Sequence, residues 1–133
     1  MSGSGTAARL AQAADGLLYT SEGDHPFDAF ELPGGGAGWP YGADEFARRI
    51  GASGGAEEVT LDKFLARHIE RADPADSVMQ GLRPRFEALK AQLQAYLRDV
   101  RVFRVGSVDV QCYAVGADAA GNLAGLHTVS VET

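Results

Sequence analysis

The last quarter of the chain, Arg101–Thr133, constrains the fold most, because its pattern is that of consecutive antiparallel strands. Residues 102–105 and 108–115 are rich in β-branched and aromatic side chains, and Gly106-Ser107 between them is a two-residue link common in β-hairpins. In the second segment, alternate positions are apolar, at Val108, Val110, Cys112 and Ala114. We therefore predict a β-hairpin with one apolar face.

A third strand is predicted at 123–131, after the turn-rich segment 116–122. Both sets of its alternating side chains include apolar residues, so we expect helices to cover both faces of the sheet. Glu132 and Thr133 follow this strand and are expected to protrude beyond the sheet.

Apolar residues recur at intervals of three and four in the preceding part of the chain, which predicts helices. The predicted helices are 6–15, 44–50, 60–69, 74–81 and 84–100, and the predicted early strands are 17–20 and 27–32. The expected N-caps are Thr6, either Thr60 or Asp62, and Asp73 before Pro74. Gly81 is expected to end the fourth helix and Pro84 to begin the fifth. Helices first and hairpin-linked strands late indicate an α+β domain.

Length and composition suit a single domain, since the chain has 133 residues of which 45% are hydrophobic. We expect residues 1–5 to form a flexible tail and residues 6–133 to form the domain. The single cysteine, Cys112, cannot form an internal disulfide, and no apolar run approaches the ~20 residues of a membrane span. The first residues lack the features of a secretory signal, so we expect a cytoplasmic protein that does not engage membranes.

The net charge of -6 is unevenly distributed along the chain. Residues 10–47 contain seven acidic side chains and residues 105–133 contain three, and neither segment contains a lysine or arginine. Such acidic segments repel nucleic acid and favour a basic partner surface. An ordinary acidic protein with no such partner would show the same charge. We therefore expect no direct binding of nucleic acid.

Catalytic and metal sites of the protein's own are poorly supported by the sequence. Cys112 and His127 fall on neighbouring predicted strands and could form a nucleophile and base, but the position of Cys112 also suits a small buried hydrophobe. The histidines His25, His68 and His127 are too widely spaced for a known metal motif. The glycine run at 34–38 lacks the features of a phosphate-binding loop and is expected to be a mobile loop. We expect no enzyme activity, no cofactor and no resident metal.

Oxygen ligands at two places suggest another role. Glu22 lies in the polar bend 21–26, and Thr133 offers a hydroxyl and a carboxylate, all of which are hard donors suited to Mg²⁺, Ca²⁺ or Mn²⁺. A protruding chain end could enter a cleft and take the open positions of another protein's metal. Alternatively, Glu22 is a solvated loop acid and residues 132–133 a frayed tail.

Two segments of the chain resemble the nuclease A inhibitor family, namely ADGLLYTSEGDHPFDAFEL at 14–32 and RVFRVGSVDVQCYAVGADAAGNLAGLHTVSVET at 101–133. Members of this family are small acidic proteins that block a sugar-non-specific, metal-dependent nuclease. The resemblance implies an α-β-α sandwich. It also implies that Thr133 enters the nuclease active site and binds its metal, with Glu22 as a second contact.

The resemblance is incomplete in the centre of the chain. The family places a contact tryptophan after a Pro-x-Asp sequence, whereas here Ser77 follows Pro74-Ala75-Asp76 and the only tryptophan is Trp39.

Our hypothesis is a monomeric inhibitor of a sugar-non-specific, metal-dependent DNA/RNA endonuclease. Glu22, Asp24, Glu132 and Thr133 would contact the nuclease, with Glu22 and Thr133 reaching its metal. The rival hypothesis is an interaction module of the same fold with a partner that is not a nuclease.

Overall fold

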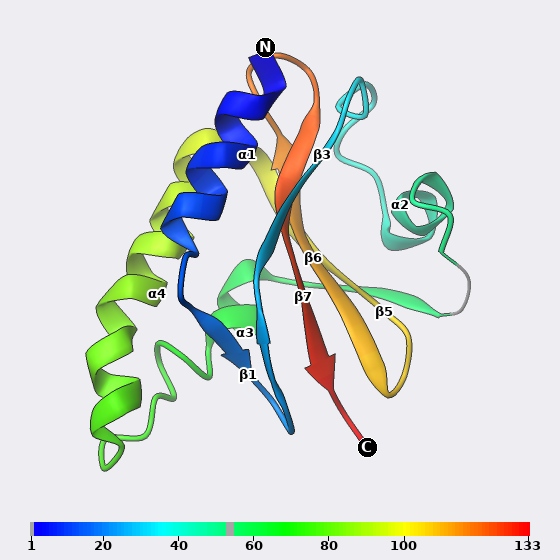
Figure 1. The fold of residues 1–133 in the computed structure, drawn as a ribbon. Coiled ribbons are helices and arrows are strands. Elements are labelled where there is room, and N and C mark those ends of the chain that lie inside the picture. The colour runs from blue at the N-terminus through cyan, green and yellow to red at the C-terminus, as the bar shows by residue number, and fades with distance from the viewer. Residues whose placement is uncertain (1, 53–54) are drawn as a thin grey trace.

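A computed structural model describes residues 2–52 and 55–133. The strands form a five-stranded antiparallel sheet of order β3-β7-β6-β5-β4 and a separate two-stranded sheet, β1-β2 (Figure 1). The elements are α1 (Ser2–Ala13), β1 (Leu18–Thr20), β2 (Asp24–Pro26), β3 (Asp28–Leu32), α2 (Ala43–Arg49), β4 (Ala56–Val59), α3 (Leu61–Leu65), α4 (Ser77–Tyr96), β5 (Arg98–Val105), β6 (Asp109–Ala117) and β7 (Leu123–Val131). The predicted α+β class is confirmed.

Helices lie on both sides of the large sheet, as the two-sided apolar pattern of the third C-terminal strand predicted (Figure 1). Helices α1, α3 and α4 pack on one face, where the sheet contributes buried residues Val102, Val110, Cys112, Ala114, Ala124 and Leu126. The smaller cluster on the opposite face surrounds Phe46 of α2, with sheet residues Phe103, Val115, Ala117 and Leu123. The three layers form the expected α-β-α sandwich.

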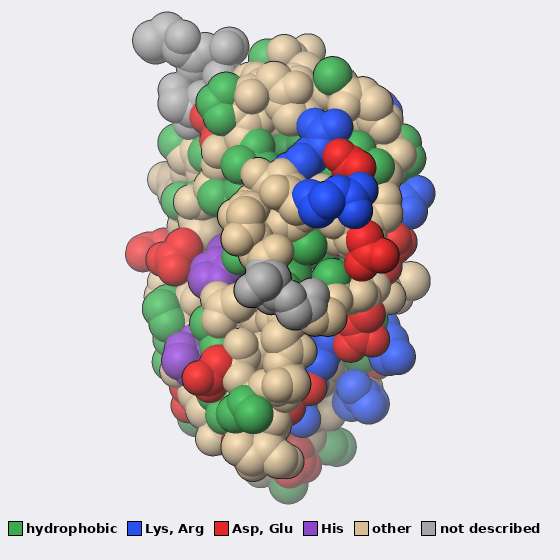
Figure 2. All heavy atoms as spheres, turned by 90° about the vertical axis from the view of Figure 1, so that its right-hand side faces the viewer, with side chains coloured by type: hydrophobic (Ala, Val, Ile, Leu, Met, Phe, Trp, Pro, Cys, Tyr) green, Lys and Arg blue, Asp and Glu red, His purple; other side chains and the backbone are tan. Residues whose placement is uncertain are grey.

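The α2 face carries charges of both signs. Figure 2 shows acidic and basic side chains side by side along one edge of this face. On α2 itself, Glu45 pairs with Arg48 at 2.7 Å and with Arg49 at 2.9 Å. Opposite charges therefore neutralise one another on α2.

The C-terminal hairpin forms, but its connection is longer than the predicted two-residue link. Residues 106–108 connect the two strands, and pairing of β5 with β6 begins only at Val105 opposite Gln111, because Asp109 and Val110 pair with β7 alone. Val108 is half exposed and lies outside the strand, and its carbonyl oxygen accepts a hydrogen bond from the Glu132 amide at 2.8 Å. The longer connection thus provides a hydrogen-bond acceptor for Glu132, the first residue after β7.

The two predicted helices 74–81 and 84–100 are in fact one helix, α4, so the predicted break at Gly81 and Pro84 is wrong. Its N-cap is Asp76, not Asp73, since the Asp76 carboxylate accepts from the amides of residues 78 and 79. Burial of Phe86, Leu89 and Leu93 at about 2 kcal/mol each outweighs the ~3 kcal/mol cost of an internal proline. The helix ends at Tyr96, and residues 98–105 belong to β5.

Other boundaries differ in smaller ways. Helix α1 begins at Ser2, so Thr6 lies within it and is not its N-cap, while flexibility of residues 1–5 stays a prediction. Thr60 is confirmed as the cap of α3, and its hydroxyl accepts from the Lys63 amide at 3.1 Å. Strands β2 and β4 were not predicted, because three or four residues are too few for a periodic signal. Within the described ranges, no helix combines the length and apolar character needed to cross a bilayer.

Candidate functional site

The bend between β1 and β2 meets the end of β7 at one pole of the molecule, which we call the tip and define as residues 21–23 and 131–133 (Figure 1). Ser21 Oγ accepts a hydrogen bond from the Val131 amide at 2.9 Å and donates one to the Gly23 carbonyl oxygen at 2.9 Å. The Glu22 amide donates to the Val131 carbonyl oxygen at 3.3 Å. The bend is therefore hydrogen-bonded to the last residue of β7.

Glu22 and Thr133, 111 residues apart in sequence, contact each other directly at the tip. The Thr133 amide donates to Glu22 Oε2 at 2.9 Å, and the Thr133 hydroxyl donates to Oε1. These hydrogen bonds, that of the hydroxyl first, lower the pKa of Glu22 below its ordinary value of 4.5. The carboxylate is therefore ionised at neutral pH, and it lies fully exposed beside the Thr133 hydroxyl.

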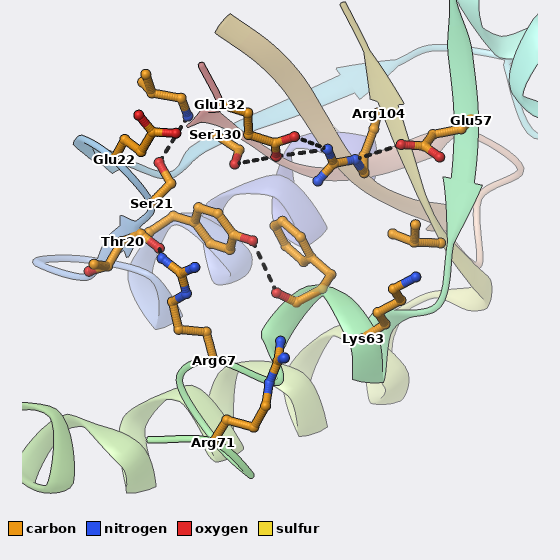
Figure 3. Close-up of a pocket in the computed structure, with 14 residues that line it drawn as sticks. Thr20, Ser21, Glu22, Glu57, Lys63, Arg67, Arg71, Arg104, Ser130 and Glu132 are labelled. Atoms are coloured by element: carbon orange, nitrogen blue, oxygen red, sulfur yellow. Dashed lines mark hydrogen bonds and ion pairs between the residues drawn. The ribbon is translucent and has the colours of Figure 1, made fainter. Parts of the chain in front are cut away.

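Glu132 points away from this pair and into the body of the protein (Figure 3). Its carboxylate accepts from Arg104 Nη2 at 2.6 and 2.7 Å and from the Ser130 hydroxyl at 2.8 Å. The hydrogen bond from Arg104 is the largest cause of the lowered pKa of Glu132. Arg104 Nε also donates to Glu57 at 3.1 Å, so this guanidinium links the tip to strand β4. Among the four predicted contact residues, Glu132 is thus held by bonds to Arg104 and Ser130 of its own chain.

Asp24 is separated from the Glu22–Thr133 pair. It lies on β2 opposite Thr20 and borders a different depression, together with the buried His68. His68 Nε2 accepts from the Thr20 amide at 3.2 Å, and burial lowers the pKa of His68 to about 4. This neutral imidazole stacks on Phe86 with centroids 4.1 Å apart and fixes β1 against the α4 side. The contact role of Asp24 stays a prediction.

Sequence reasoning missed Ser21, Arg104 and Ser130, which hold the tip in shape. Arg104 did carry a signal. Its side chain lies on the same face of β5 as that of Val102, which packs against α1, α3 and α4. A charged side chain at such a position requires a partner. Ser21 and Ser130 carry no comparable signal, because a serine beside a turn or in a strand is ordinary.

The structure contradicts a Cys112–His127 catalytic pair. Cys112 lies opposite Thr128 and His127 lies opposite Tyr113, so the two side chains are on opposite faces of the sheet. Cys112 is fully buried, and that burial raises the pKa of its thiol to about 11. His127 Nε2 is 2.7 Å from the side-chain oxygen of Gln111. Neither residue is arranged as a nucleophile or its base.

The only tryptophan cannot replace the contact tryptophan of the family. Trp39 is 5% exposed, and its indole N–H donates to the carbonyl oxygens of Arg98 and Asp99 at 3.1 and 3.0 Å. Ser77, which follows Pro74-Ala75-Asp76, is the first residue of α4. The tip therefore has no aromatic side chain of this kind from either position.

Metal-binding groups do not gather elsewhere in the described part of the chain. Within residues 2–52 and 55–133, no three His, Cys, Asp or Glu side chains are grouped so that they could hold an ion. At the tip, Glu22 and Thr133 are the two predicted contact residues not tied to Arg104, and their oxygens would leave most positions of a metal to ligands from another molecule. Its arrangement suits completion of a partner's metal site.

Comparison with known proteins identifies the family of this chain. A family model described as nuclease A inhibitor-like protein matches residues 4–133, which includes both halves of the tip and the divergent centre. A comparison with curated proteins found no match. Because the matched segment spans nearly the whole sequence, the chain belongs to the nuclease A inhibitor-like family.

Proposed function

We propose that this protein inhibits a sugar-non-specific, metal-dependent nuclease by inserting the tip into its active site. Family membership supports nuclease inhibition in general. In the proposed complex, oxygens of Thr133 and Glu22 take positions on the catalytic metal that substrate phosphate oxygens would otherwise occupy. Nucleic acid is excluded because the tip fills the same cleft.

The contact between Glu22 and Thr133 is the observation that carries this proposal. Two exposed residues, distant in sequence, present an ionised carboxylate and a hydroxyl at one point of the surface. Their mutual hydrogen bonds and those of Ser21 fix this geometry before binding. Preorganised groups lose less conformational freedom on association, so more of the contact energy appears as affinity.

Charge supports the same proposal. Glu22 and Asp24 belong to the acidic segment 10–47, which contains seven acids and no lysine or arginine. A nuclease cleft that holds phosphates is lined by cations, so this segment would accelerate the encounter at low salt. The acids of this segment that do not contact the metal would thus increase the rate of association with the nuclease.

Plasmid degradation by a non-specific Mg²⁺-dependent nuclease tests the proposal. Equimolar wild-type protein should protect the plasmid. Three variants should protect poorly: the protein with a tag after Thr133, the protein without Thr133, and the substitution Glu22→Gln. Glu58→Gln is the matched control, because Glu58 is an exposed acid that pairs with Arg101 on the sheet and not at the tip. Circular dichroism must show that all variants are folded. Full protection by the tagged and truncated proteins would refute the proposed role of Thr133.

A partner that is not a nuclease is a second candidate, favoured by the burial of Trp39 and the presence of Ser77 in place of the family's contact tryptophan. Capture of bound proteins from the source cell separates the two candidates. A basic metal-dependent hydrolase among them supports inhibition. Capture of other proteins alone, combined with no plasmid protection, supports the second candidate.

A further inference from the structure

A cleft of about 440 Å³ lies next to the tip, between the β1–β2 hairpin and the segment that includes α3 (Figure 3). Its volume falls in the range of small-molecule sites. Tyr19 and Phe64 form a rigid base, with ring centroids 4.8 Å apart and the Tyr19 hydroxyl donating to the Phe64 carbonyl oxygen at 3.3 Å. The cleft is therefore a built feature of the fold.

Three cationic side chains line one wall of this cleft, at Lys63, Arg67 and Arg71. Lys63 is in α3, and Arg67 and Arg71 are in the turns that follow this helix. Arg67 Nη1 donates to the Thr20 carbonyl oxygen at 3.0 Å, which orients this guanidinium along the wall. A guanidinium has five N–H donors, so most of those on Arg67 are left for a ligand.

The acids that line the cleft are engaged elsewhere. Glu57 and Glu132 both bind Arg104 on the opposite wall, and Glu22 binds Thr133. In the part of the chain that the structure describes, no carboxylate lies within ion-pair distance of Lys63, Arg67 or Arg71. One wall thus carries three positive charges that are not neutralised by contact (Figure 3).

We infer that this cleft binds a phosphate dianion, either free or as the end of a phosphomonoester, with Arg67 and Arg71 as its ligands and Lys63 as a further positive charge on the same wall. The whole lining has four cationic and three acidic side chains, and three of the cations lie together on the α3 side, away from Arg104 and the acids that it binds. On that side a phosphate can meet more than one cation at once, which a single carboxylate does less well. The phosphate oxygens project in several directions and can accept from donors spread along the wall, and guanidinium forks fit phosphate well. The cleft of about 440 Å³ is larger than a phosphate, so a small organic group attached to the phosphate could lie against Tyr19 and Phe64. This site needs no nuclease and goes beyond inhibition.

Titration of the full chain with inorganic phosphate, AMP and adenosine, followed by heteronuclear NMR, tests the inference. Phosphate and AMP should shift the amide signals around Arg67 and Arg71 saturably, and adenosine should not. Arg71→Gln should weaken phosphate binding about tenfold or more, since hydrogen bonds to charged groups are among the strong ones. Arg83→Gln, which removes the same charge from α4, should leave the phosphate affinity unchanged.

The outcomes are distinct. Tighter binding of AMP than of phosphate would support the site and assign it to phosphomonoesters, and equal binding would support a free-phosphate site. Binding of AMP that adenosine matches, or equal loss of affinity in Arg71→Gln and Arg83→Gln, would overturn it. If Arg71→Gln does not fold, Arg67→Gln replaces it. Because these titrations contain no nuclease, their failure leaves the plasmid-protection result untouched.

Discussion

Arg104 is predicted to be the main anchor of the tip, and Arg104→Gln tests this. The guanidinium bonds Glu132 and Glu57 from a side chain that is 19% exposed, whereas the Glu132 side chain is 41% exposed. Loss of a partner in a fully buried ion pair costs about 3–5 kcal/mol, and an exposed pair contributes about 0–1 kcal/mol. This half-exposed arrangement lies between the two, so we expect a loss of about 1–2 kcal/mol in the free energy of unfolding. For a chain of this length, that corresponds to a fall in Tm of about 3–8 °C.

Arg101→Gln is the matched control for this prediction. Arg101 is on the same strand and also bonds a glutamate of β4, Glu58, at 3.1 Å, but the Arg101 side chain is 36% exposed, against 19% for Arg104, and among the described residues it bonds only this one glutamate. We expect it to lose less than about 0.5 kcal/mol and to inhibit nuclease normally. Urea unfolding of both variants and of a cycle with Glu132→Gln should give an Arg104–Glu132 coupling of about 0.5–1.5 kcal/mol. Equal stability of Arg104→Gln and Arg101→Gln, within about 0.3 kcal/mol, would refute the anchor.

Three further predictions concern the tip, the sheet and helix α4. Because the folded-state pKa of Glu22 is lowered, its contribution to stability is present above pH 4.5 and is lost as the pH falls through the folded value, so Glu22→Gln should flatten the pH dependence of Tm in that acidic range. Gly125→Ala should lose more than about 4 kcal/mol or fail to fold, because a Cβ there would overlap the Ala114 carbonyl oxygen of the paired strand, and a native-like Tm would contradict that packing. Gly81→Ala should instead gain about 0.5–1 kcal/mol by urea unfolding, since Gly81 lies inside α4 with open space around it, and a loss would argue against a continuous helix.

The strands at the end of the chain were predictable because their signal is local. Alternation along 123–131 matched β7 residue for residue, and helix spacing matched α2 to within one residue. The centre was not predictable in the same way, since glycine and proline signals at Gly81 and Pro84 indicated a break. Packing of the apolar side of α4 against the sheet overrides them.

The candidate site was predictable in its members more than in its arrangement. Glu22 and Thr133 were selected as oxygen donors and by resemblance, and the structure brings them into contact. No local sequence pattern predicts this contact. It depends on the pairing of β1 with β2 and on the hydrogen bonds between the β1–β2 bend and the end of β7. The inward turn of Glu132 depends likewise on Arg104, which is 28 residues away in sequence.

The most direct test of the central proposal is a paramagnetic NMR measurement on the complex. The protein, labelled with ¹⁵N, is titrated with a nuclease that it inhibits, loaded with Mn²⁺ in place of its catalytic metal and compared with the Mg²⁺ form. Direct ligation predicts severe broadening of the amide signals of Glu22 and Thr133, with less at Glu58 on the sheet edge. A tight complex in which these two signals keep their Mg²⁺ intensities would place the tip away from the metal and contradict the proposed mechanism.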